Sequence, residues 1–217
     1  MELTIKIPQS YGDITLKKWL EVQKELENYK EDEEATTALL LYYICELDPI
    51  YLRNIAIDDY MMLKDELTRV LNPTDLPLQQ FVTIDGVKYG FEPNLSEMAY
   101  GAFVDITKYD TFTIDKNWAN IMSILYRPVT KEKNGMYWIE KYTGKIDAEK
   151  WMNVGMDVHM GTLFFFLNLS TDLLKGILKS MKEEDIPLQL KKTLERSGDT
   201  IAQSMIWPMG TYSNLPK

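Results

Sequence analysis

The sequence predicts an α+β fold, mainly helical with a small antiparallel sheet, from three observations. Apolar residues recur at the spacing of one helical face in several segments. Residues 80–91 form two strand-like runs joined by Asp85-Gly86, a dipeptide typical of type I′ turns, which predicts a β-hairpin. The chain has no repeat of fixed period and no long flexible linker. The sequence therefore predicts a single α+β domain over residues 1–206.

The chain is expected to begin with a strand followed by a helix. Apolar residues alternate with polar ones at about 2–7, the period of a half-buried strand, and Pro8 ends the run. Thr15 then stands as an N-cap before apolar residues spaced along one helical face from Leu16 to Leu26.

Two further helices are expected before residue 73. Residues 35–47 are nearly apolar all round, which predicts a central helix stopped by Asp48-Pro49. Residues 60–71 are again apolar at helical spacing, with Asp58 or Asp59 as the cap and Asn72-Pro73 as the end.

The middle of the chain changes character after a Pro-containing stretch. Residues 72–78 offer a boundary between a helical part and a mixed part, although a loop inside one domain is the preferred interpretation. After the hairpin, residues 102–106 predict a further strand. Asp115 then caps a helix over 116–126, which Pro128 ends, and residues 136–142 alternate as a strand.

The C-terminal part is expected to be helical. Residues 147–152 predict a short helix, 157–181 a long one and 188–205 a final, more polar one. The remaining residues, 207–217, contain Pro and Gly and are expected to form a mobile tail.

Charge and residue usage exclude several classes of function. Lys plus Arg number 24 against 33 Asp plus Glu, so the net charge of −9 disfavours nucleic acid, and no basic patch is evident. One cysteine, Cys45, and one histidine, His159, rule out disulfide frameworks, Cys-rich zinc sites and the usual catalytic triads. We therefore expect no enzyme, no cofactor and no metal site, and a structural role for both residues.

The location of the protein follows from what the sequence lacks. No secretory signal opens the chain, and the apolar run 158–171 is too short to span a bilayer. These features predict residence in a reducing cytoplasm.

Dense acids at Asp58-Asp59, 32–34 and 183–185 are candidate catalytic carboxylate pairs, but helix caps and solvated faces account for acids at such places.

Aromatic residues and methionine are the unusual positive feature, with 13 Tyr, 5 Trp, 7 Phe and 12 Met. Protein interfaces favour aromatic residues, Met and Arg, and residues 121–142 combine all three. The candidate partner-binding residues are Tyr126, Arg127, Tyr137, Trp138 and Tyr142. Arg127 lies at a helix C-terminus, whose carbonyl groups favour a cation. It is expected to bridge to an acid on the hairpin or on a partner, and an internal ion pair is the preferred interpretation.

Three short motifs follow one another in the second half of the chain. The first is a D-G-x-x-Y-G hairpin, carried here by Asp85, Gly86, Tyr89 and Gly90. An LYRP box at residues 125–128 and a Gly-containing, Phe-rich helix at 161–166 follow. In this order the motifs resemble small, mostly uncharacterised proteins from structural gene modules of tailed bacteriophages. The resemblance covers residues 79–181 and implies a non-enzymatic virion, tail-assembly or connector protein in the host cytoplasm or the virion. It implies no catalytic residue.

The leading hypothesis is therefore a bacteriophage virion or tail-assembly protein that binds other phage structural or assembly proteins, and self-association is compatible with it. One alternative is a small hydrolase that uses a carboxylate pair. Another is a membrane-peripheral host-interaction protein that uses residues 164–166.

Overall fold

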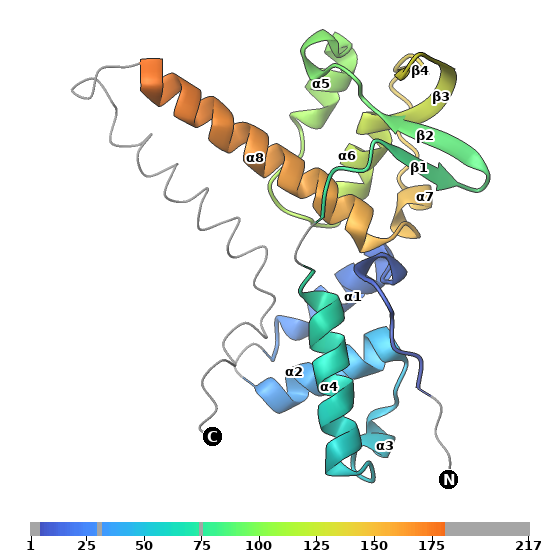
Figure 1. Ribbon diagram of the computed structural model, residues 1–217, viewed down its shortest axis with the longest axis vertical. Helices are drawn as coiled ribbons and strands as arrows, with labels where there is room; N and C mark the ends of the chain where they lie inside the picture. The colour runs from blue at the N-terminus through green and yellow to red at the C-terminus, as the bar shows by residue number, and fades with distance from the viewer. Residues whose placement is uncertain (1–4, 30–31, 74–75, 181–217) are drawn as a thin grey trace. The chain divides into compact units, whose positions relative to one another are not determined.

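The computed structural model describes residues 5–29, 32–73 and 76–180 (Figure 1). The chain divides into two compact units. The first, here called the helical unit, takes residues 1–14, 18–75 and 167–217. The second, the sheet unit, takes residues 15–17 and 76–166. The change of unit after residue 75 lies inside the segment 72–78, where the composition shifts.

The three helices predicted in the first third are confirmed, and one short helix is new. The elements are a 3-10 turn at Tyr11–Asp13 and the helices α1 (Leu16–Leu26), α2 (Glu33–Cys45), α3 (Pro49–Leu52) and α4 (Ile57–Leu71). In the helical unit the apolar faces of α1, α2 and α4 are buried, as at Val22, Leu40 and Leu67, each 0% exposed. Burial of these faces removes apolar surface from water and stabilises the unit.

The helix ends differ from the predicted ones for local reasons. Asp32 begins α2 early, because its side chain accepts a hydrogen bond from the backbone N–H of Ala35 at 2.9 Å. The helix ends at Cys45, where Glu46 takes a left-handed conformation with φ 57°. Asp48 caps α3. The expected cap of α4 at Asp58 or Asp59 is wrong, since both acids lie in its first turn.

The strand expected at about 2–7 is wrong over residues 5–7, the part of it that the structure describes. Those residues belong to no strand, and all four strands of the sheet come from residues 81–139. Alternation of apolar and polar residues is compatible with a strand, but a strand forms only where a neighbouring strand completes the hydrogen-bonded ladder. The remainder of that prediction, residues 1–4, lies outside the described residues.

The sheet unit contains a four-stranded antiparallel sheet in the order β1-β2-β3-β4, which confirms the α+β class (Figure 1). The strands are β1 (Phe81–Ile84), β2 (Val87–Phe91), β3 (Tyr126–Lys133) and β4 (Met136–Ile139). The predicted hairpin is confirmed, and Asp85 and Gly86 take the positive φ angles, 52° and 77°, of its turn.

A second hairpin joins β3 to β4 through Asn134-Gly135, with φ angles of 52° and 78°. Strand β3 is not among the predicted strands, whereas β4 lies within the strand predicted at 136–142. Helix α6 (Trp118–Leu125) ends before Pro128 as expected, but the chain continues directly into the strand. The expected cap at Asp115 is wrong, since Asn117 is the N-cap of α6; the Asp115 side chain instead accepts from the backbone N–H of Asn117 at 2.7 Å.

The strand expected at 102–106 is wrong, because this segment is part of the helix α5 (Tyr100–Ile106). Ala102 is fully buried, whereas Tyr100 and Phe103, three residues apart, are 81% and 57% exposed. A five-residue apolar run fits a strand or a helix equally well by periodicity, so packing decided between them.

The C-terminal helices α7 (Glu149–Met152) and α8 (Met156–Ser180) confirm the two predictions at 147–152 and 157–181. Helix α8 contributes its residues up to Phe166 to the sheet unit and the following ones to the helical unit. The expected helix at 188–205 and tail at 207–217 lie outside the described residues. Among the described residues, no helix combines the length and the apolarity that crossing a membrane requires.

Candidate functional site

The residues predicted to bind a partner lie on β3, on β4 and just beyond β4. The packing of the two hairpins against each other therefore positions them. A Cβ atom on Gly90 would lie 2.8 Å from Cε2 of Tyr137. The Tyr137 ring therefore rests directly on the β2 backbone, with its centroid 4.6 Å from that of Phe81. Its hydroxyl donates to the carbonyl of Phe91 at 2.7 Å. Tyr137 thus fixes β4 across the first hairpin.

Arg127 is held by three groups of its own chain. Its guanidinium pairs with the Glu92 carboxylate at 2.5 Å, and the two side chains are only 11% and 9% exposed. The Nε–H donates to the carbonyl of Glu140, and Nη1 to that of Ile124, both at 2.8 Å. Arg127 therefore connects the end of α6, the end of β2 and the residue after β4. This agrees with the expectation of an internal ion pair.

Tyr126 lies in the core of the sheet unit, at 1% exposure. Its hydroxyl donates to the carbonyl of Gln79 at 2.7 Å and lies 3.3 Å from the Thr162 hydroxyl. Its ring packs against Phe91 and Trp151, with centroid distances of 5.2 and 5.1 Å. Burial raises the pKa of Tyr126 to about 12. In this structure the side chain presents no surface to a partner.

Tyr142 joins the segment after β4 to helix α5. Its hydroxyl donates to the Asp105 carboxylate at 2.5 Å, and its ring covers Gly101 at 3.7 Å from an ideal Cβ. Desolvation and this acidic neighbour together raise the pKa of Tyr142 to about 12. The pKa of Asp105 is lowered, chiefly by its hydrogen bond from Lys108. Tyr142 is half-buried and engaged within its own unit.

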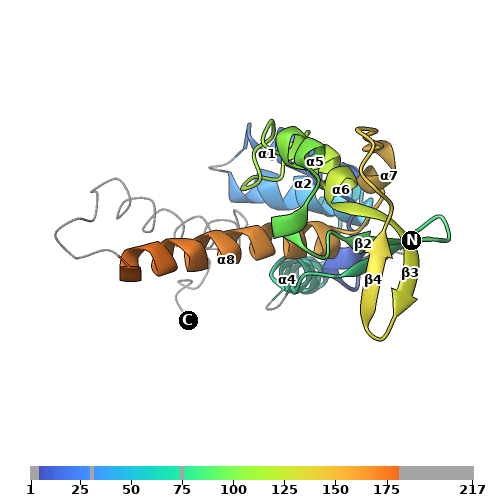
Figure 2. The ribbon, with the colours of Figure 1, turned by 90° about the horizontal axis from the view of Figure 1, so that it is seen from above.

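Trp138 is the one predicted partner-binding residue that is open to solvent, at 44% exposure. Met136, two residues earlier on the same side of β4, is 59% exposed. Lys131 and Lys133 stand opposite them on β3, in register with Trp138 and Met136 respectively. We call Lys131, Lys133, Met136 and Trp138 the hairpin outer face. The hairpin tip projects away from the helices of its unit (Figure 2).

Met136 and the two lysines were missed by the sequence prediction. The Asn134-Gly135 dipeptide between two polar-apolar runs is a turn signal of the same kind as Asp85-Gly86. It would have placed β3 beside β4 and paired these residues across the hairpin.

Tyr89 and Gly161, which belong to motifs of the phage resemblance, make close contacts in the sheet unit, whereas Asp85 and Gly86 are exposed in the turn. Tyr89 is buried, and its ring lies 5.8 Å from that of Trp151. A Cβ on Gly161 would lie 2.5 Å from the carbonyl oxygen of Pro77, so α8 approaches this loop backbone as only glycine allows. Tyr89 and Gly161 thus contribute to the packing of this unit.

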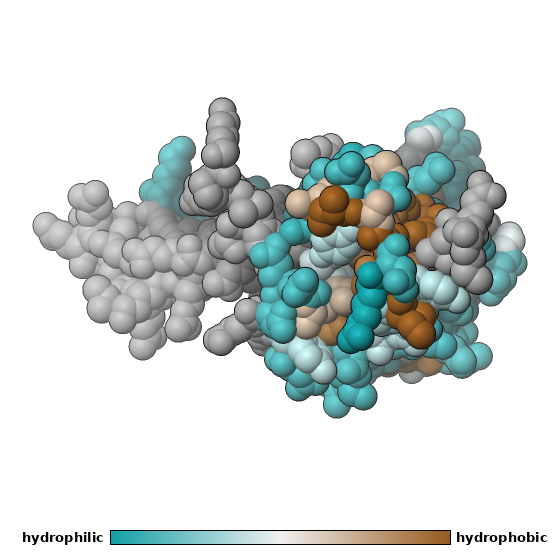
Figure 3. Space-filling model, turned by 90° about the horizontal axis from the view of Figure 1, so that it is seen from below, coloured by the Kyte–Doolittle hydropathy of each residue, from teal (hydrophilic) through white to brown (hydrophobic). Residues whose placement is uncertain are grey.

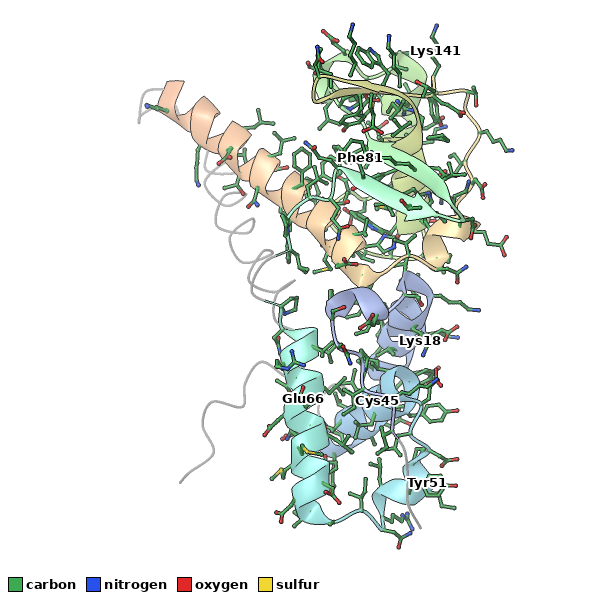
Figure 4. The ribbon with its side chains drawn as sticks, turned by 45° about the vertical axis from the view of Figure 1, so that its right-hand side comes forward. Lys18, Cys45, Tyr51, Glu66, Phe81 and Lys141 are labelled. Carbon is green, nitrogen blue, oxygen red and sulfur yellow. The ribbon has the colours of Figure 1, made fainter. Side chains whose placement is uncertain are left out.

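His159 and Cys45 are both buried. His159 is 0% exposed, its Nε2 lies 3.1 Å from the carbonyl of Trp151, and burial lowers its pKa to about 4. Cys45 lies inside the helical unit (Figure 4), and burial raises the pKa of its thiol to about 11. A thiol of that pKa is a poor nucleophile at neutral pH.

The dense acids that the sequence marks do not converge where the structure describes them. Asp32 caps α2, Glu33 pairs with Lys64 at 2.6 Å, and Asp58 and Asp59 are exposed on α4. The acids at 183–185 lie outside the described residues. Within residues 5–29, 32–73 and 76–180, no three His, Cys, Asp or Glu side chains gather to hold a metal ion.

The chain matches no protein-family model, no curated protein and no solved structure.

Proposed function

We propose that this chain is a non-enzymatic bacteriophage virion or tail-assembly protein that acts by binding other structural proteins. The phage context rests on the order of the D-G-x-x-Y-G hairpin, the LYRP box and the Phe-rich helix. The binding role rests on the hairpin outer face, and above all on the exposed indole of Trp138.

The physical argument for binding starts from the cost of this exposure. Trp and Met side chains in water forgo the stabilisation that burial would provide, and tryptophan is enriched among the residues that dominate interface affinity. Lys131 Nζ lies 5.2 Å from the Trp138 ring centroid, so a positive charge stands beside the apolar side chains. An apolar centre with a charged rim is the usual anatomy of a protein interface. Strand β4 is also the last strand in the sheet, whose order is β1-β2-β3-β4.

The test measures binding of the purified chain to each structural protein encoded beside its gene, by isothermal titration calorimetry. Trp138→Ala should weaken binding by about 30-fold or more, the loss typical of a dominant interface residue. Phe103→Ala is the matched control, because Phe103 is a comparably exposed aromatic residue on α5.

Two results would contradict the proposal. Loss of binding in Phe103→Ala with unchanged binding in Trp138→Ala would move the contact surface to α5. Absence of binding to every neighbouring structural protein, together with absence of the chain from purified particles and assembly intermediates by mass spectrometry, would reject the role itself.

A further inference from the structure

The hairpin outer face is a local basic surface on an acidic protein. Lys131 and Lys133 flank Met136 and Trp138 on it, and both lysines are exposed. Glu132, between the lysines, points to the opposite side of the strand and pairs with Lys88 at 2.7 Å. The face therefore combines an apolar centre with positive charge, whereas the whole chain has a net charge of −9.

A second exposed face, on α4 of the helical unit, has the opposite charge. Its core side is formed by Leu63, Leu67 and Val70, all buried. The other side carries exposed apolar residues and two acids at spacings of three and four. We call this set the α4 outer face: Ile57, Asp58, Met61, Met62 and Asp65.

The apolar members of the α4 outer face are more exposed than is usual for such side chains. Ile57 is 68% exposed, Met61 49% and Met62 58%. Figure 3 shows one face of the chain, on which apolar and hydrophilic residues lie side by side. Methionine is a flexible, polarizable side chain that adapts to a partner surface. The face is thus apolar and acidic together.

We propose that the hairpin outer face of one copy of this chain binds the α4 outer face of a second copy. Trp138 and Met136 would pack on Met61 and Met62, and the two lysines would face Asp58 and Asp65. The inference rests on the proposed function, since it assigns a partner to the same hairpin surface.

Two features of the surfaces favour a second copy. Copies with a net charge of −9 repel one another, so association requires a local surface of the opposite sign, and the hairpin outer face supplies it. The two faces differ from each other, so the contact is heterologous, and each copy keeps one face of each kind open. Such contacts continue head to tail and close into rings when the rotation allows.

Charge reversal tests the pairing. Sedimentation velocity of the full chain over a range of concentrations measures self-association, at low and at high salt because exposed charges are screened. Lys131→Glu with Lys133→Glu should weaken self-association by at least about tenfold, and so should Asp58→Lys with Asp65→Lys. A chain carrying all four substitutions should recover it, since the two faces are again opposite in charge.

The matched control reverses two exposed lysines elsewhere, Lys17→Glu with Lys116→Glu, which changes the net charge as the hairpin variant does. It should associate like the unmodified chain, and circular dichroism should show every variant folded. Failure of the four-fold variant to recover association, or equal weakening by the control, would overturn the pairing.

A monomeric chain at all concentrations would also overturn it. The proposed function fails separately, since it predicts loss of binding to another structural protein in Trp138→Ala. A monomer that loses such binding when Lys131 and Lys133 are reversed would assign the hairpin outer face to that other protein.

Discussion

Replacing Arg127 by methionine removes one partner of the buried ion pair while keeping most of the side-chain volume. Glu92, whose side chain is 9% exposed, would then hold a charge without its counter-ion, and the carbonyls of Glu140 and Ile124 would each lose a donor. Breaking a buried pair in this way costs about 3–5 kcal/mol. A domain is typically stable by about 5–15 kcal/mol in total. The melting temperature should therefore fall by about 10 °C or more.

The assay is urea denaturation followed by circular dichroism, with amide hydrogen exchange in β2 and β3 to report on the sheet unit itself. Arg127→Met combined with Glu92→Leu should recover most of the loss, because an apolar pair replaces the ion pair without a stranded charge. Arg69→Met is the matched control. Arg69 pairs with Glu66 at a similar distance of 2.8 Å, but the two side chains are 62% and 46% exposed, so its loss should cost less than about 1 kcal/mol.

The reasoning is refuted if Arg127→Met unfolds at the same urea concentration as the unmodified chain. It is refuted equally if the combined variant is no more stable than Arg127→Met alone, because the loss would then not come from the stranded Glu92 charge. A folded, fully stable Arg127→Met that no longer binds a partner would instead make Arg127 an interface residue.

Three further predictions follow from buried or crowded positions. Gly90→Ala should destabilise the chain by about 1–3 kcal/mol in urea denaturation, because the new Cβ meets the ring of Tyr137; Gly176→Ala, with open space around it, should be neutral or stabilising. His159 has a native pKa of about 4 against about 6.5 when unfolded, so stability should fall as pH drops from about 6.5 to 4, by up to about 3 kcal/mol; a His159→Gln variant that shows the same fall would contradict this origin. Cys45 should react with a thiol reagent slowly in the native chain and rapidly in urea, and equal rates would show that the thiol is accessible.

Local patterns were sufficient for five of the helices and for one hairpin. The helices α1, α2, α4, α6 and α8 repeat apolar residues over two or more turns, and burial of that face is what the tertiary structure then uses. Asp85-Gly86 specifies its turn through the positive φ angles of two adjacent residues, which needs no distant contact.

The strand expected near the N-terminus and the strand expected at 102–106 show where such patterns fail. Both runs are short, and a short apolar run acquires a conformation from its neighbours. Residues 5–7 have no strand beside them, and α5 buries Ala102 while it turns Phe103 outward. β3 is the converse case: the helix ends before Pro128 as expected, and pairing with β2 and β4 makes the residues that follow a strand that was not predicted.

The candidate partner-binding residues were identified by type and position, but the sequence did not separate exposed from buried members. Trp138 and Tyr137 are adjacent and both aromatic, yet one faces solvent and the other lies on Gly90. Their opposite directions follow from the period of a strand; which direction is inward depends on the second hairpin folding over the first.

By itself the sequence determined the α+β class, the long helices, the first turn and the scarcity of nucleophiles and imidazoles, because each depends on residues close together in the chain or on composition alone. Only the tertiary structure decided that Arg127 is bound inside its own unit and that Trp138 and Met136 share an open face with two lysines. The contacts of Arg127 join it to Glu140 and Glu92, 13 and 35 residues away, which no local pattern pairs. The open face depends on which side of the second hairpin packs on the first, and this is decided only when the hairpins meet.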